Sequence, residues 1–152
     1  MQLIWQCKPF SALSTDELYD LMVLRQRVFV LEQACLYLDA DGKDKHAYHL
    51  MGRDEDGALQ GYARLLPAGA SYPDPSFGRV VTAPEARGLG LGHALAGEIM
   101  ACMARLFPAQ AITIGAQAHL QGFYGGYGFV AVGAVYLEDG IPHLDMRWQR
   151  AP

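Results

Sequence analysis

The chain has 152 residues, of which 51 % are hydrophobic and 18 % are charged, and its formal net charge is −4 at pH 7. This length predicts a single domain, residues 1–152, which can bury about two-thirds of its unfolded surface. The negative charge argues against a nucleic-acid partner, and no apolar run approaches the ~18 residues of a membrane span. The first residues lack the basic and apolar segments of a secretory signal, so we expect a cytoplasmic protein without a membrane partner.

The cysteines do not form a recognisable framework. Cys7, Cys35 and Cys102 are odd in number, widely separated and without a Cys-x-x-Cys pair. Such spacing predicts neither disulfides nor a zinc site, and each cysteine is expected to be a small buried residue. We therefore expect no bound metal.

The first predicted elements are a short strand at residues 3–7 and a helix that begins at Ser14. Ser14 and Glu17 have the spacing of a capping box. The apolar stripe of this helix has Arg25 in one of its positions, and Glu32 continues the stripe one turn after Phe29. Because buried charge is costly unless it is paired, this inward charge predicts either a cleft or an ion pair.

An acidic loop is predicted at residues 36–45, where Asp39, Asp41 and Asp44 surround Gly42. It lacks the ligand spacing of an EF-hand. The loop is interpreted either as a solvated acidic segment or as a lip that recognises a cationic amine.

A hairpin is predicted next, with strands at 47–53 and 59–66 joined by a turn that ends in Asp56-Gly57. A stiff connection containing Pro73 and Pro75 then leads to the central part of the chain.

The central part reads as strand 77–82, helix 93–107 and strand 111–116, a β-α-β crossover whose strands normally pair in parallel. A helix-like segment at 118–127, weakened by glycines, follows it. A last hairpin of strands 129–137 and 143–148 turns at Asp139-Gly140.

A glycine-rich loop, Arg-Gly-Leu-Gly-Leu-Gly at 87–92, lies between the central strand and helix. Free backbone N–H groups and the positive end of a helix dipole suit a phosphate or pyrophosphate. A dinucleotide fingerprint is excluded because His93 stands at its third glycine. A Walker A loop is excluded because no Lys-Ser/Thr follows.

Two motifs carry a resemblance to a known superfamily. Arg-x-x-Gly-x-Gly at 87–92 and Tyr-x-x-x-Gly-Phe at 124–129 resemble the two halves of the GNAT N-acetyltransferase pattern. Three further stretches, at 24–33, 115–121 and 138–143, are similar to the ElaA-like branch of that superfamily.

The resemblance implies an α+β fold of the three-layer α/β type. Its sheet is mixed and mostly antiparallel, with about seven strands, flanking helices and a splayed central strand pair. The pantetheine arm of acetyl-CoA, the implied co-substrate, lies between the splayed strands.

The cofactor roles implied by the resemblance fall on two segments. Val80, Val81 and Thr82 would bind the pantetheine arm, and Gln117 stands where many superfamily members have Asn. The residues implied for the pyrophosphate are Arg87, Gly88, Leu89, Gly90, Leu91 and Gly92, with a contact from His93 at the helix start.

Acyl transfer from a thioester to an amine requires a hydrogen-bond donor for the oxyanion and a base for the amine. It also requires an acid for the leaving thiolate. The motif makes Tyr124 the candidate acid, since a phenol pKa near ~10 is close to that of an alkyl thiol, ~8.5. A backbone N–H near Val81 would polarise the thioester carbonyl. Glu32 is the favoured base, in competition with the histidines, of which His143 is the best candidate. Arg25, Glu32 and His143 are the residues expected to bind the acceptor.

We therefore predict an N-acetyltransferase that moves an acetyl group from acetyl-CoA to an amine by direct attack in a ternary complex. The acceptor is a small-molecule or peptide amine, with a cationic amine as one candidate, and the protein is a monomer or a homodimer. The alternative is a non-catalytic module that binds acyl-CoA as a sensor or for interaction.

Overall fold

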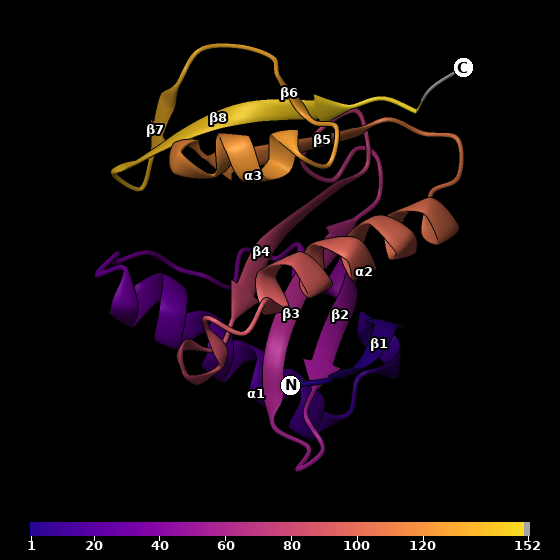
Figure 1. Ribbon diagram of the computed structural model, residues 1–152, viewed down its shortest axis with the longest axis vertical. Coiled ribbons are helices and arrows are strands. Elements are labelled where there is room, and N and C mark those ends of the chain that lie inside the picture. Colours follow the sequence, from indigo (N-terminus) through magenta and orange to yellow (C-terminus); the bar gives the residue numbers. More distant parts are fainter. Residues whose placement is uncertain (151–152) are drawn as a thin grey trace.

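The computed structural model describes residues 1–150 and contains two antiparallel sheets (Figure 1). The first sheet has the order β1-β2-β3-β4, with β1 (Ile4–Pro9), β2 (Tyr48–Arg53), β3 (Leu59–Leu66) and β4 (Ser76–Thr82). The second has the order β5-β8-β6, with β5 (Ile112–Gln117), β8 (Ile141–Trp148) and β6 (Val130–Ala131), and β7 (Tyr136–Glu138) also pairs with β8. The expected α+β architecture is confirmed.

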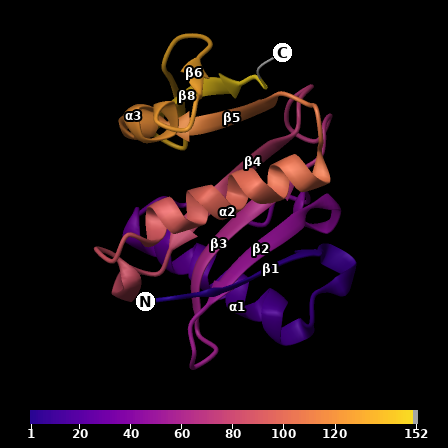
Figure 2. The same ribbon diagram turned by 45° about the vertical axis from the view of Figure 1, so that its right-hand side comes forward.

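Helices cover both faces of the first sheet. The helix α1 (Thr15–Arg25) packs in one apolar cluster with Met51 and Tyr62, and α2 (Leu91–Leu106) in another with Leu50 and Ala63. Because successive strand residues point to opposite faces, the two helices lie on opposite sides. The three-layer arrangement therefore holds for this half of the molecule, and Figure 2 shows α2 crossing the sheet.

The strands β4 and β5, which α2 connects, diverge rather than pair. The N–H of Thr113 donates to the carbonyl of Pro75 at 3.1 Å, where the two strands come close. No ladder joins β4 to β5 within residues 1–150, and the sheets separate away from this point (Figure 1). The expectation of parallel pairing from the crossover is wrong here, and the splayed pair implied by the family resemblance is present.

A β-bulge bends β4 at the point of divergence. Tyr62 pairs with Val81 and Arg64 with Gly78, so two residues of β4 face the single residue Ala63. Arg79 in this bulge has a φ of 50°, which is uncommon for a residue with a side chain. The conformation therefore requires support from the surrounding structure.

The C-terminal half differs in detail from the sequence prediction. The helix-like segment is a 3-10 turn at Ala118–Leu120 followed by the short helix α3 (Gln121–Gly125). The predicted strand 129–137 is wrong as one strand, because residues 132–135 separate β6 from β7. The Asp139-Gly140 turn is confirmed, with φ values of 51° and 76° that fit a tight hairpin. In the described chain no helix is both long and apolar enough to cross a membrane.

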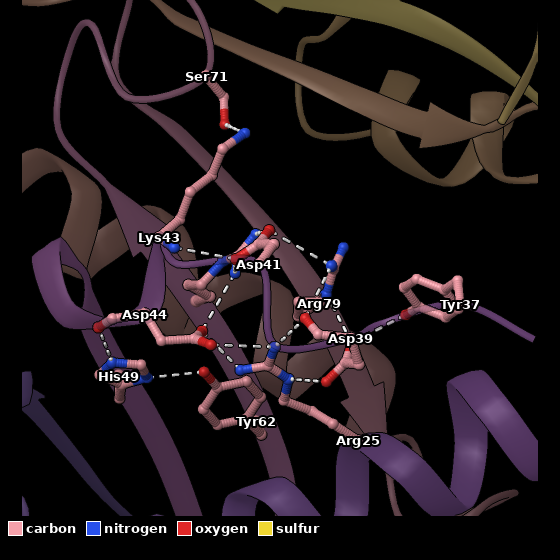
Figure 3. A network of polar contacts seen from close by, with 11 residues as sticks. Arg25, Tyr37, Asp39, Asp41, Lys43, Asp44, His49, Tyr62, Ser71 and Arg79 are labelled. Atoms are coloured by element: carbon pink, nitrogen blue, oxygen red, sulfur yellow. Dashed lines mark hydrogen bonds and ion pairs between the residues drawn. The ribbon is translucent and has the colours of Figure 1, made fainter. Parts of the chain in front are cut away.

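Arg25 is buried at the end of α1, with no exposed surface, between two aspartates of the following loop (Figure 3). Its Nε lies 2.7 Å from Asp39 Oδ2, and its Nη1 lies 2.7 Å from Asp44 Oδ1. The sequence left open whether the inward charge of Arg25 marks a cleft or an ion pair. The structure shows that Arg25 forms ion pairs.

Two further arginines and one aspartate complete the network. Arg64 Nη1 lies 2.7 Å from Asp41 Oδ1 and 3.1 Å from Asp44 Oδ1. Arg79 Nε lies 2.8 Å from Asp39 Oδ1, and its Nη2 lies 3.4 Å from Asp41 Oδ2. Arginines and aspartates alternate around a closed circuit, here called the Arg–Asp ring, whose members are Arg25, Asp39, Arg79, Asp41, Arg64 and Asp44.

The Arg–Asp ring changes the interpretation of the acidic loop. Burial opposes ionisation of its aspartates, but hydrogen bonds from Arg64 and from the Lys43 N–H outweigh it and lower the pKa of Asp41 to about 2. Each of the three carboxylates is paired with two arginines. The loop is therefore neither the solvated acidic segment nor the lip of free carboxylates that the sequence left as alternatives, because its aspartates are paired with arginines.

His49 attaches the ring to the sheet. Its Nδ1 is 2.7 Å from the hydroxyl of Tyr62 and its Nε2 is 2.9 Å from the carbonyl of Asp44. The side chain is fully buried. Its role is therefore structural.

We expect Arg25→Met to destabilise the fold by about 3–5 kcal/mol, because it leaves buried carboxylates without their partner. Urea unfolding measures the loss. Arg27→Met is the control, since Arg27 forms an ion pair with Glu85 in which both side chains are largely exposed, 43 % and 54 %. That change should cost at most about 1 kcal/mol. Equal losses in the two variants would show that the ring does not support the fold.

Stability should also decline in acid. Hydrogen bonds lower the pKa of Asp41 to about 2, and Arg25 lowers that of Asp44, so their stabilisation is complete above the unfolded pKa of ~3.9 and is lost as pH falls toward 2. Burial lowers the pKa of His49, so the unfolded state binds this proton first, below pH ~6.5, and the loss has the same sign.

The free energy of unfolding should therefore be flat above about pH 7 and fall between about pH 6.5 and 2. In Asp41→Asn the decline below pH ~4 should be shallower. Urea unfolding across this range measures both, and a wild-type protein equally stable at pH 3 and pH 7 would contradict the argument.

Candidate active site

A cleft of about 790 Å³ opens where β4 and β5 diverge. One wall is residues 76–82 of β4, and the facing wall includes residues 114–117 of β5. The π-helical turns Gln26–Glu32, the loop that follows them and the β7–β8 turn supply further lining residues. The cleft therefore lies between the two sheets and is bordered by segments from both halves of the chain.

The three residues expected to bind the pantetheine arm lie on the β4 wall. Val80, Val81 and Thr82 all line the cleft, and Val81 pairs with Tyr62 of β3. In the bulge, Arg79 and Val80 face the single residue Ala63, which leaves backbone groups without a ladder partner. Gln117 lines the opposite wall at the end of β5.

The glycine loop forms an open cradle at the start of α2. Gly88 and Gly90 have φ values of 81° and 75°, and a Cβ added to Gly88, Gly90 or Gly92 would meet no atom within 4 Å. In the part of the chain that the structure describes, the backbone N–H groups of 88–93 have no hydrogen-bond partner. They lie at the positive end of a 16-residue helix, which is the arrangement that binds phosphates.

The leucines and the histidine of this segment have different surroundings. Leu89 is exposed, Leu91 is buried in the core beneath α2, and only their backbone belongs to the cradle. His93 Nδ1 lies 2.9 Å from the hydroxyl of Tyr127, so its side chain joins α2 to the segment after α3.

Glu32 and Arg87, 55 positions apart in the sequence, form an ion pair at the cleft, with Glu32 Oε1 2.7 Å from Arg87 Nη1. The π-helical turns give a different residue spacing from the regular helix assumed from the sequence. Glu32 is consequently exposed at the cleft mouth, its side chain 41 % accessible, and not turned into the core. The pair joins the favoured base to the first residue of the phosphate loop.

Tyr124 lies on α3 and lines the cleft from below the second sheet. Its ring packs against Phe77, Phe123 and Phe129. Its hydroxyl forms no hydrogen bond with residues 1–150, and burial raises its pKa to about 12. The phenol is therefore protonated near neutral pH and can donate.

His143 lines the cleft from β8, opposite Gln117 in the β5–β8 register. Its Nδ1 is 2.7 Å from the carbonyl of Ile141, which fixes Nδ1 as a donor. In the neutral ring Nε2 then carries the lone pair, 3.5 Å from Glu138 Oε2. The contact with Glu138 is an ion pair only when Nε2 is protonated, and the neutral ring is the form that could act as a base.

Arg25 does not line the cleft; it lies below it in the Arg–Asp ring. Three cations that sequence reasoning missed do line it, namely Lys43, Arg64 and Arg79. Charged residues inside the otherwise apolar strands 59–66 and 77–82 were a usable signal for the two arginines. No sequence pattern distinguishes Lys43. Among residues 1–150 no cluster of His, Cys, Asp or Glu could hold a metal ion.

Comparisons with known proteins agree with this geometry. The family model described as acetyltransferase (GNAT) domain matches residues 24–150. A UPF0039 protein of Synechocystis is 43 % identical over 100 % of this chain and 99 % of its own length. Protein ElaA of Escherichia coli is 40 % identical over 93 % of this chain and 94 % of its own.

Two crystal structures show the same arrangement. An acyl-CoA N-acyltransferase from Pseudomonas aeruginosa has a TM-score of 0.92 and 46 % identity, covering 97 % of this chain and 99 % of that one. Escherichia coli ElaA has a TM-score of 0.90 and 38 % identity, covering 97 % and 100 %. The splayed strands, the phosphate cradle and these matches over nearly the full length lead to one conclusion: the chain belongs to the GNAT superfamily of acetyltransferases and, within it, to the ElaA-like family.

Proposed function

We propose that this protein transfers an acetyl group from acetyl-CoA to an amine by direct attack in a ternary complex. The observation that carries the proposal is that one cleft contains both Arg87, where the phosphate loop begins, and Tyr124, whose hydroxyl is unpartnered within the described residues. A phosphate-bearing thioester and a proton donor for its sulfur would meet in that cleft.

Two sets of residues would bind acetyl-CoA, one at the pyrophosphate and one at the pantetheine arm. The free N–H groups of 88–93, with Arg87, would hold the pyrophosphate. Val80, Val81 and Thr82 on one wall, with Gln117 on the other, would hold the pantetheine arm. A backbone N–H near Val81 would polarise the thioester carbonyl.

The reaction forms one bond between the amine nitrogen and the acetyl carbon and breaks the bond from that carbon to sulfur. Tyr124 would give its proton to the departing thiolate. Its raised pKa of about 12 keeps the phenol protonated, and it also makes transfer to a thiolate of pKa ~8.5 unfavourable unless the proton moves as the C–S bond breaks.

The amine proton needs a base, and two side chains compete for this role. Glu32 is held by Arg87 at 2.7 Å, so a pyrophosphate that attracts Arg87 would leave the carboxylate free to accept a proton. His143 offers Nε2, with Nδ1 fixed as the donor. We retain Glu32 as the proposed base and His143 as the alternative.

The second candidate function is a module that binds acyl-CoA without turnover. It would need the phosphate loop but not the acid. The unpartnered hydroxyl of Tyr124 within the cleft favours the enzyme.

Coenzyme A should bind and raise the melting temperature, since a ligand of the folded state stabilises it by mass action. Gly92→Val should weaken binding by ~10- to 100-fold, the value of a lost charge-assisted hydrogen bond, because it places a side chain in the cradle. Gly97→Val is the matched control: both glycines are exposed in α2, and a Cβ at either would meet no atom within 4 Å. Titration calorimetry measures both. Equal affinities in the two variants would contradict the loop assignment.

Tyr124→Phe keeps the ring and removes the proton. We expect kcat to fall by ~10²- to 10⁴-fold, the usual value of general acid catalysis, while coenzyme A affinity is unchanged. Release of the coenzyme A thiol in the presence of an amine panel measures turnover. Tyr48→Phe is the control, because Tyr48 packs on Phe107 away from the cleft. Full activity in Tyr124→Phe would rule out Tyr124 as the acid, and no turnover with any amine would favour the binding module.

A further inference from the structure

The wall of the cleft formed by the acidic loop and β4 is not acidic. Asp41 is its only aspartate from the Arg–Asp ring that lines the cleft, and two arginines neutralise it. Three cations, Lys43, Arg64 and Arg79, line the same wall. The ring is balanced, three arginines against three aspartates, so the charge of Lys43 is left in excess at this wall.

Arg79 has a donor that the ring does not use. Its Nε and Nη2 face Asp39 and Asp41, whereas Nη1 has no partner among residues 1–150. In Figure 3 this second terminal nitrogen points away from the aspartates. The guanidinium also stacks on Tyr37, 5.5 Å from the ring centroid, and extends from the β4 bulge. It is thus a fixed donor at the edge of the network.

Lys43 is half-buried and lacks a carboxylate partner in the described chain. Its Nζ donates to Ser71 Oγ at 2.7 Å and forms no ion pair with residues 1–150. This bond spans the space between the acidic loop and the loop before β4 (Figure 3). An ammonium has three N–H donors, so two remain. The bond to Ser71 is exposed, so the remaining donors are open to a ligand in the cleft, and a bound anion would give the cation a charged partner.

Arg64 is the third cation of this wall, and its terminal nitrogens are occupied by Asp41 and Asp44. The residue is only 4 % exposed, and its Nε is buried with no hydrogen-bond partner in the structure. Buried polar groups of this kind are normally satisfied by protein, water or ligand. Because this Nε has almost no accessible surface, it does not face the cleft, and the free donors of the wall belong to Lys43 and Arg79.

We propose that Lys43 and Arg79 form a subsite for a carboxylate carried by the acceptor. The acceptor is then an amino acid or a short peptide with a free carboxylate, and not a polyamine. This inference rests on the proposed function and specifies its substrate class. The carboxylate would accept hydrogen bonds from Lys43 Nζ and Arg79 Nη1, which are strong because donor and acceptor are both charged. Arg79 directly precedes Val80 of the pantetheine wall, so the anion would lie beside the reacting centre.

Matched pairs of acceptors test the proposal. Amino acids and dipeptides are compared with their C-terminal amides in the release of coenzyme A thiol from acetyl-CoA. The free acids should have a kcat/KM ~10- to 100-fold higher than the amides, the value of one or two charge-assisted hydrogen bonds. Amides that react equally well or better would overturn the subsite and leave the proposed acetyl transfer intact.

Lys43→Met tests the residue itself, and Lys45→Met is the matched control. Lys45 is an exposed neighbour that does not line the cleft. In Lys43→Met the preference for the free acid should fall to within about threefold, mainly through KM. Lys45→Met should keep the wild-type preference. A full preference in Lys43→Met would overturn the assignment.

A binding measurement tests the carboxylate subsite independently of whether the protein transfers acetyl groups. N-acetylglycine, N-acetylleucine and their amides are titrated into protein saturated with coenzyme A, which needs no turnover. The acids should bind ~10- to 100-fold tighter than the amides, and Lys43→Met should abolish the difference. Tight binding of the acids without turnover of any amine would support the subsite and reject the enzyme. Equal affinities, or no binding of any acid, would overturn the subsite.

Discussion

The burial of Arg25 is the constraint on which the rest of this structure depends. A guanidinium with no exposed surface is stable only when its donors are satisfied, and Asp39 and Asp44 satisfy them at 2.7 Å each. These contacts tie the irregular loop after α1 to the end of that helix. Through Asp39 they also reach Arg79, whose left-handed backbone forms the bulge in β4. One buried charge thus fixes the loop and the strand that border the cleft.

The bulge connects this network to the chemistry. It places Arg79 and Val80 opposite the single residue Ala63, at the end of β4 that has separated from β5. Under the proposed function, the same strand would offer backbone groups to a pantetheine arm and the Arg79 guanidinium to an acceptor. The Arg–Asp ring uses its acids internally, which leaves donors and not acceptors on the acceptor wall. The ring would contribute to acceptor selectivity in two ways: it neutralises the aspartates, and it leaves the Arg79 donor free.

The glycine loop is joined to the π-helical turns after α1 by the ion pair of Arg87 and Glu32. Neither residue belongs to the Arg–Asp ring, and both are partly exposed, so this pair can rearrange at lower cost than the buried ones. A ligand in the glycine loop that attracted Arg87 would therefore change the surroundings of Glu32, the proposed base.

The sequence by itself determined the features that depend on local backbone chemistry and on motif spacing. The glycines at 88, 90 and 92 predicted a phosphate cradle, the Asp-Gly turns predicted both hairpins, and the two motifs indicated the family and its splayed strands. Only the tertiary structure decided the partners of each charge. Arg25 lies 14 and 19 positions from Asp39 and Asp44, and Glu32 lies 55 positions from Arg87. Helical periodicity predicts that a charge faces inward, but its partner depends on how distant segments fold together. The prediction of direction also fails where the helix widens into π turns, as it does at Gln26–Glu32.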